Sequence, residues 1–209
     1  MLGTIAHAIW IASNPDFSHE QSWDGSNYSI QDSMGSRGTI SFAGDLAVGV
    51  FFDKESTRNP FRTAQPYHMD SLLTGMSPEH LSLANNEALQ YVLQEYDGTV
   101  MPIITAAFWN AGEHLTAAEP WSQVFIHGAH LIRIQLHDPV AAIKEWQTEY
   151  QMSSSQVNLM KSLFERRIAY PNQQIFLNDW EQDILTSSGM EGLTESQELL
   201  AAVGVVLPY

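Results

Sequence analysis

The sequence predicts a single α+β domain over residues 1–209, with a β-rich N-terminal part and a helical C-terminal part. Three observations lead to this fold class. The first third is rich in Gly, Ser, Asn and Thr and contains apolar runs of strand length. Further along, apolar side chains recur at helical spacing. The chain also has 6 Trp, 9 Phe and 7 Tyr, enough to build a core.

An antiparallel hairpin is expected near residues 39–53. Residues 39–42 alternate between polar and apolar side chains, and 43–45, Ala-Gly-Asp, have the composition of a turn. Residues 46–52 then form a continuous apolar run, which indicates a strand buried on both faces.

A helix is expected near 78–96. Ser77 followed by Pro78 is typical of an N-cap and the first helical position. The helix would end at Asp97-Gly98. Its apolar stripe, at i, i+3, i+4 and i+7, consists of Leu89, Val92, Leu93 and Tyr96.

A second strand pair is expected near 121–137, around Gly128. Ile132, Ile134 and Leu136 alternate with polar residues, which predicts a strand with one apolar face.

The C-terminal part is expected to consist of helices near 139–151, 154–169, 179–186 and 195–203, which could form a helical subdomain at 138–209. Each has a capping residue or a capping-box pattern at its start. These residues are Asp138, Ser153, Asn178 and Thr194.

The formal net charge is −15, from 9 Lys+Arg against 24 Asp+Glu. All cations fall in residues 37–62 and 133–167, so residues 1–36, 63–132 and 168–209 are purely anionic. Such a field repels phosphate backbones and anionic membrane surfaces, which argues against nucleic-acid and membrane partners. It favours a basic protein as partner, or a small molecule whose binding does not depend on the global field. A second interpretation is that the net charge only keeps the protein in solution.

Targeting and redox signals favour the cytoplasm. The apolar stretch 2–12 has no cation before it, unlike a signal peptide, and no apolar run approaches the roughly 20 residues of a membrane helix. The chain has no cysteine, which excludes disulfides, thiolate nucleophiles and cysteine-ligated metals.

Catalytic candidates are confined to a group of histidines and one neighbouring acid, and no cofactor motif or metal-ligand motif occurs. A cysteine-independent hydrolase would require several of them to converge with carboxylates in one pocket. The candidates are His127, His130, His137, Glu113 and His114.

Binding candidates lie between residues 18 and 61, where aromatic faces mix with planar hydrogen-bonding groups. Such mixtures are typical of binding surfaces, and they suggest a small-ligand-binding module. A second interpretation assigns the aromatic residues to the core and the polar ones to turns. The candidates are Trp23, Asp24, Tyr28, Arg37, Asp53 and Arg58.

In composition alone the chain is similar to small acidic bacterial inhibitor or immunity proteins, which neutralise a cationic toxin domain by charge complementarity. No residue-level correspondence supports this similarity. Because no catalytic motif is present, the leading hypothesis is an acidic interaction protein without enzymatic activity that binds a basic protein. The hydrolase and the ligand-binding module are the alternatives.

Overall fold

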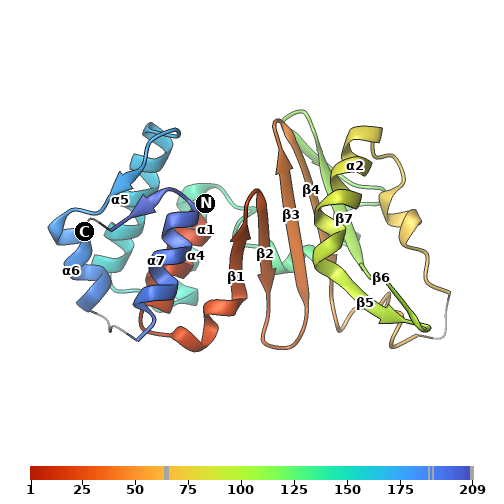
Figure 1. Cartoon of the computed structure of the whole chain (residues 1–209), viewed down its shortest axis with the longest axis horizontal. Coiled ribbons are helices and arrows are strands. Elements are labelled where there is room, and N and C mark those ends of the chain that lie inside the picture. The colour runs from red at the N-terminus through yellow and green to blue at the C-terminus, as the bar shows by residue number, and fades with distance from the viewer. Residues whose placement is uncertain (64–65, 188, 190, 208–209) are drawn as a thin grey trace. The chain divides into compact units, whose positions relative to one another are not determined.

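The computed structural model describes residues 1–63, 66–187, 189 and 191–207. The chain divides into two compact units: unit 1 comprises Met1–Ser22 and Arg133–Tyr209, and unit 2 comprises Trp23–Ile132. The α+β class is confirmed, with the main sheet in the N-terminal half and several helices in the C-terminal half (Figure 1). The single domain over 1–209 and the helical subdomain at 138–209 stay predictions.

The main sheet is antiparallel, with its six strands in the order β1-β2-β3-β4-β7-β8. The hairpin expected near 39–53 is confirmed as β3 and β4, joined in register from Arg37↔Phe52 to Ala43↔Leu46. The strands are β1 (Gln21–Asp24), β2 (Asn27–Gln31), β3 (Arg37–Ala43), β4 (Leu46–Phe52), β7 (Ala106–Ala111) and β8 (His114–Thr116).

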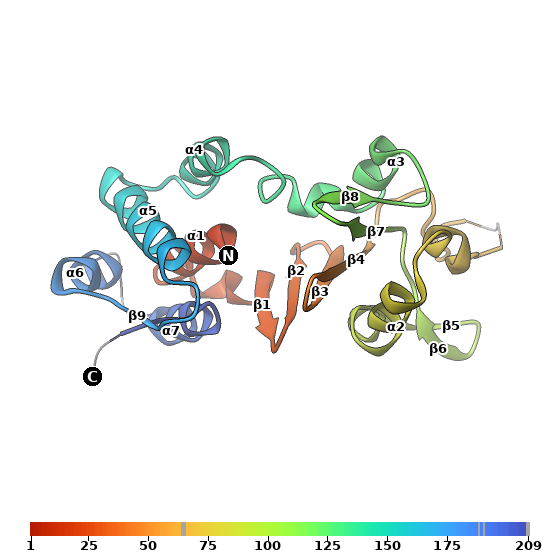
Figure 2. The ribbon, with the colours of Figure 1, turned by 90° about the horizontal axis from the view of Figure 1, so that it is seen from above.

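Helical segments cover both faces of the unit 2 sheet (Figure 2). On one face, α2 (Pro78–Asn86) and the 3-10 helix η3 (Ala88–Val92) pack on Val48, Val50 and Trp109. On the other, α3 (Trp121–Ile126) and η4 (Ala129–Ile132) approach the strands. Because both faces are covered, β4 is apolar throughout, as its sequence predicts.

Two glycines in the central strands leave space for aromatic rings. Gly38 is paired with Phe51 and Gly49 with Phe108, and each ring lies over its glycine. A Cβ atom would come within 2.2 Å of the Phe51 ring at Gly38 and within 2.5 Å of the Phe108 ring at Gly49. No other residue type fits there without displacing a ring.

The helix expected near 78–96 is correct only in its first half. α2 begins at Pro78 with Ser77 as its cap but ends at Asn86; η3 follows, and then β5 (Leu93–Tyr96) pairs with β6 (Thr99–Pro102). Asp97 and Gly98 have φ of 50° and 74°. Two positive φ angles favour a tight hairpin turn, so the Asp-Gly pair turns a hairpin instead of ending a helix.

The strand pair expected near 121–137 is wrong. Residues 121–126 form α3 and 129–132 form η4. The buried residues Val124, Gly128 and Ile132 are four apart, which is helical spacing. The short alternation from Ile132 to Leu136 begins at the last residue of η4 and continues through the turn at 133–136.

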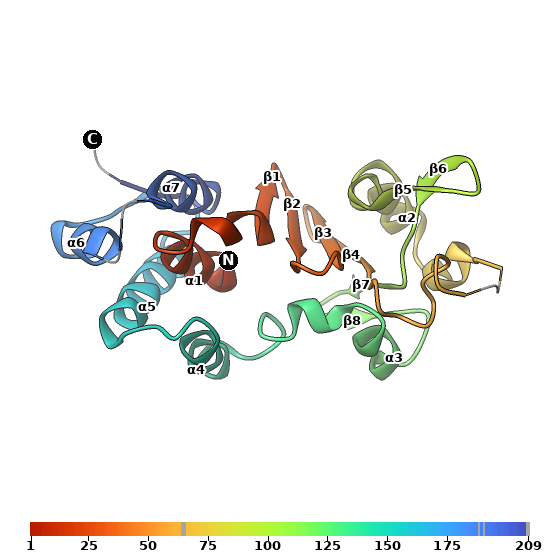
Figure 3. The ribbon, with the colours of Figure 1, turned by 90° about the horizontal axis from the view of Figure 1, so that it is seen from below.

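Unit 1 is built around α1 (Leu2–Ile11), whose residues are almost all buried and which contacts α4, α5 and α7 (Figure 3). All four C-terminal helices expected from the sequence are present. They are α4 (Pro139–Glu149), α5 (Ser154–Ala169), α6 (Asp179–Ser187) and α7 (Leu193–Ala202).

Short elements complete the chain. The 3-10 helices η1 (Pro15–Glu20) and η2 (Met69–Leu73) lie in units 1 and 2, respectively, and β9 (Ile175–Phe176) pairs in parallel with β10 (Val205–Val206). In the part of the chain that the structure describes, every helix is too short or too polar to cross a membrane.

Candidate functional site

The loop after β4 is held by three successive side-chain turns. Asp53, Ser56 and Asn59 are buried, and each accepts a hydrogen bond from the backbone N–H two residues ahead, at 2.8, 3.1 and 2.9 Å. Short polar side chains favour this arrangement because they can bond to the nearby backbone. These three side chains, spaced D-x-x-S-x-x-N, therefore hold the backbone of residues 53–61 in its conformation.

A second turn, between β2 and β3, is joined to this loop. Asp32 Oδ1 accepts the N–H groups of Met34 and Ser36 at 2.9 and 2.8 Å. The buried Ser36 hydroxyl accepts the N–H of Lys54 at 3.1 Å and lies 3.3 Å from Asp53 Oδ1, to which it donates. Hydrogen bonds thus join the two loops to each other.

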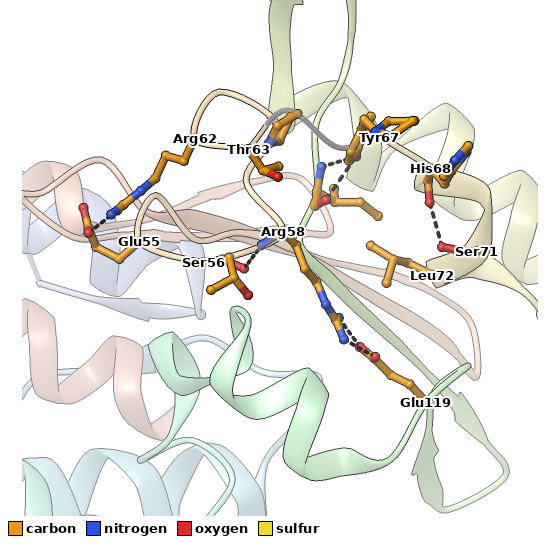
Figure 4. A pocket seen from close by; sticks show the side chains of 14 residues that line it. Glu55, Ser56, Arg58, Arg62, Thr63, Tyr67, His68, Ser71, Leu72 and Glu119 are labelled. Atoms are coloured by element: carbon orange, nitrogen blue, oxygen red, sulfur yellow. Dashed lines mark hydrogen bonds and ion pairs between the residues drawn. The ribbon is translucent and has the colours of Figure 1, made fainter.

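The larger concavity, here called the polar cavity, lies between the 55–63 loop and residues 66–72 and has a volume of about 920 Å³ (Figure 4). Most of its lining side chains are polar or charged. The labelled residues are Glu55, Ser56, Arg58, Arg62, Thr63, Tyr67, His68, Ser71, Leu72 and Glu119.

An ion pair between Arg58 and Glu119 lines the polar cavity. The guanidinium donates to both carboxylate oxygens at 2.6 and 2.5 Å and also to the backbone oxygen of Thr105 at 3.1 Å. The two side chains are 27% and 18% exposed. Because the Arg58 charge is matched by a bidentate carboxylate, this pair anchors the loop to residue 119.

Beside this pair, Ser56 Oγ lies 2.8 Å from His127 Nδ1. Burial, and next the positive charge of Arg58, lower the pKa of His127, which favours the neutral imidazole. Among the residues that the structure describes, none forms a hydrogen bond or ion pair with the other ring nitrogen. A serine–histidine pair without an orienting third group lacks the arrangement of a nucleophilic triad.

A second concavity of about 630 Å³, here called the cationic pocket, shares Glu55 and Arg62 with the polar cavity. Three cations line it against one carboxylate, so its formal charge is +2. Its lining residues are Met34, Gly35, Arg37, Phe52, Lys54, Glu55, Asn59, Phe61, Arg62 and Gln94.

The cations of this pocket differ in whether a nearby carboxylate neutralises their charge. Arg62 pairs with Glu55, and both side chains are at least half exposed. Arg37 and Lys54 form no ion pair with any of the described residues. The Arg37 guanidinium instead lies 5.3 Å from the centroid of the Phe52 ring, and burial lowers its pKa. Two positive charges of the pocket are therefore unmatched.

Apolar groups stand exposed beside these charges. Phe61 is 49% exposed and Met34 is 64% exposed. The Phe61 ring makes edge contacts with Phe52 and Tyr96, at centroid distances of 6.4 and 5.7 Å. The pocket therefore combines unmatched positive charge with the exposed Phe61 ring, which is positioned by its contacts with two other aromatic rings.

The structure does not bring the binding residues expected from the sequence together in one site. Arg37 lines the cationic pocket, Arg58 lines the polar cavity, and Asp53 holds the loop between them. Trp23 and Tyr28 line neither; their rings pack together at 5.2 Å. Asp24 accepts a hydrogen bond from the Tyr91 hydroxyl at 2.7 Å.

The catalytic candidates do not converge. His127 bonds to Ser56, and His130 lies 3.2 Å from the Phe125 carbonyl oxygen. Glu113 and His114 are exposed at the β7–β8 turn. His137 belongs to unit 1, where it faces Glu145 at 3.0 Å. Within the described ranges, no three His, Asp or Glu side chains are placed to hold a metal ion.

Sequence reasoning missed most of the cationic pocket. The residues it overlooked are Met34, Lys54, Glu55, Phe61, Arg62 and Gln94. One signal was available, because the four cations of residues 37–62 are the only ones before residue 133. All four line one of the two concavities.

Comparison with protein-family models, curated proteins and solved structures finds no match to this chain. The geometry and chemistry of the site itself therefore carry the functional inference.

Proposed function

We propose that unit 2 binds a small anionic ligand that carries an apolar or aromatic group. The observation that carries this proposal is the pairing of two unmatched cations, Arg37 and Lys54, with the exposed Phe61 ring in one pocket. Ligand sites typically combine apolar surface with a few placed polar groups.

The charge of the surroundings supports an anionic ligand. Unit 2 has 4 cations and 12 carboxylates, a formal charge of −8, yet the cationic pocket carries +2. Adjacent like charges repel, and an unmatched pair of cations is stabilised when an anion binds between them. The carboxylates of unit 2 could have compensated Arg37 and Lys54 but lie elsewhere.

Isothermal titration with three naphthalene probes tests the proposal. We expect 2-naphthyl sulfate, an anion, to bind more tightly than neutral 2-naphthol, and 2-naphthylmethylammonium, a cation, to bind weakest. Arg37→Gln should weaken sulfate binding by about tenfold, the loss of one charge-assisted contact. Lys161→Met removes an exposed cation of unit 1 and should leave binding unchanged. Equal affinity for all three probes would contradict the proposal.

A second function, binding of a basic protein, is supported by exposed carboxylates of unit 1. Four exposed carboxylates lie on or beside α6 and α7 and form no ion pair with the described residues, while Arg133 and Arg166 pair within the unit. The carboxylates are Asp179, Asp183, Glu191 and Glu198. An inhibitor or immunity-type role in bacteria would use this surface.

Capture from lysate at low salt tests the second function. A basic protein should be retained and released as salt rises, because salt screens exposed charges. Retention no stronger than on a charge-matched control protein would count against it. A cytoplasmic location and the absence of nucleic-acid partners remain part of this proposal.

A further inference from the structure

We infer that the anionic group recognised by the cationic pocket carries two charges on one centre, as a phosphate monoester does. This inference rests on the proposed binding of an anionic ligand and names its chemical class.

The register of the hairpin brings the two unmatched cations together. Arg37 is paired with Phe52 at the end of the hairpin, and beyond it the Ser36 hydroxyl bonds to Asp53 and to the N–H of Lys54, which holds the two loops together. The Lys54 side chain passes over Gly35, with its Cδ atom 3.6 Å from the position of a Cβ there. The side chain of Lys54 therefore lies beside the segment that carries Arg37, and both cations line the same pocket.

The charge count then favours a dianion. Glu55 neutralises Arg62 in an ion pair, so the two positive charges that remain in the pocket are those of Arg37 and Lys54. A monoanion would leave one of them unmatched, whereas a dianionic phosphate matches both. The planar guanidinium can hold two oxygens of a tetrahedral phosphate, and the ammonium group can approach a third as a point charge.

A polar side chain of the pocket offers a further donor. The Nε2 atom of Gln94 is buried and has no hydrogen-bond partner, although the residue lines the pocket. A buried N–H group without a partner is unfavourable, and turning this amide toward a bound oxyanion would supply the missing acceptor. The carbon part of the ester would contact Phe61 and Met34, the exposed apolar groups of the same pocket.

Two isosteric probes of different charge test the inference. At pH 8, 2-naphthyl phosphate is a dianion and 2-naphthyl sulfate a monoanion of the same shape. We expect the phosphate to bind about tenfold more tightly, the value of one extra charge-assisted contact. At pH 5 the preference should disappear, because the second pKa of a phosphate monoester is about 6. Inorganic phosphate, which lacks the ring, should bind more weakly than the ester.

Variants locate the effect. Lys54→Met should abolish the preference of phosphate over sulfate, and Lys161→Met should keep it; unfolding temperatures of both variants serve as the folding control. Equal binding of the two probes at pH 8, or an unchanged preference in Lys54→Met, would overturn the inference while the proposed function stands. If neither probe binds, both fail.

Discussion

At the scale of single residues, His7 shows how burial controls a charge. The side chain is fully buried in unit 1, its Nδ1 lies 3.0 Å from the Tyr150 hydroxyl, and its ring lies against those of Trp10 and Tyr150. Burial lowers the pKa of His7 from 6.5 to about 4. The folded protein therefore holds a neutral imidazole at neutral pH.

The low pKa of His7 predicts a loss of stability in mild acid. Between pH 6.5 and about 4, the unfolded chain takes up a proton at His7 that the folded chain does not. The free energy of unfolding should fall by about 1.4 kcal/mol per pH unit in this window and stay level above it, about 3 kcal/mol in total.

Urea titrations at several pH values measure this effect in the wild type and in His7→Gln, which cannot take up the proton. Carboxylates titrate in both proteins, so the difference between the two curves isolates His7. We expect that difference to change steadily between pH 6.5 and 4. Parallel curves would show that His7 is not held neutral.

At the scale of elements, the loop from residue 53 to 61 determines the geometry of the cationic pocket. Asn59 is the central connection: its Oδ1 accepts the N–H of Phe61 at 2.9 Å, and its Nδ2 donates to the Lys54 carbonyl at 2.7 Å. One buried side chain thus holds two residues of the pocket at once.

Asn59→Ala should therefore lower both stability and binding. Loss of two buried hydrogen bonds should cost about 1–3 kcal/mol of unfolding free energy. Because Lys54 and Phe61 lose a common support, 2-naphthyl sulfate should also bind more weakly. Asn85→Ala, which removes an exposed asparagine of α2, is the matched control and should change neither quantity much. Unchanged probe binding in Asn59→Ala would show that the loop does not position the pocket.

Most helix starts and the central hairpin could be predicted from the sequence because their determinants are local. The cap expected at Thr194 is wrong, because α7 begins at Leu193 with Gly192 at its N-cap and no side-chain cap. Ser77, Asp138 and Ser153 cap their helices, and Asn178 and Glu181 form a reciprocal capping box at 3.0 and 2.9 Å. The wrong assignments of helix and strand arose where the same few residues fit both the helical period and the strand period of apolar side chains. Leu89 to Tyr96 fits a helical stripe but divides into a 3-10 turn and a strand at Leu93.

At the scale of the whole molecule, the net charge of −15 is distributed unevenly between the surface and the pockets. Each unit is acidic, unit 1 with 5 cations against 12 carboxylates and unit 2 with 4 against 12. The cations of unit 2 are concentrated at the polar cavity and the cationic pocket. Total charge therefore describes the outer field, and the local arrangement decides what a pocket can bind.

The candidate site could be predicted only in part, because it depends on contacts that no local pattern reveals. Arg37, Asp53 and Arg58 could be singled out by residue type. That Glu119 compensates Arg58 across 61 positions, while no carboxylate in the described chain compensates Arg37, depends on the tertiary fold. The packing of Trp23 on Tyr28, away from both concavities, depends on it too.

The most direct test of the central claim is a map of amide chemical shifts recorded as 2-naphthyl phosphate is added to the ¹⁵N-labelled full chain. If the cationic pocket is the binding site, the largest shifts should fall on residues 34–37, 52–62 and 94, and Lys54→Met should reduce them. Shifts confined to unit 1, or spread evenly over the chain, would contradict the account.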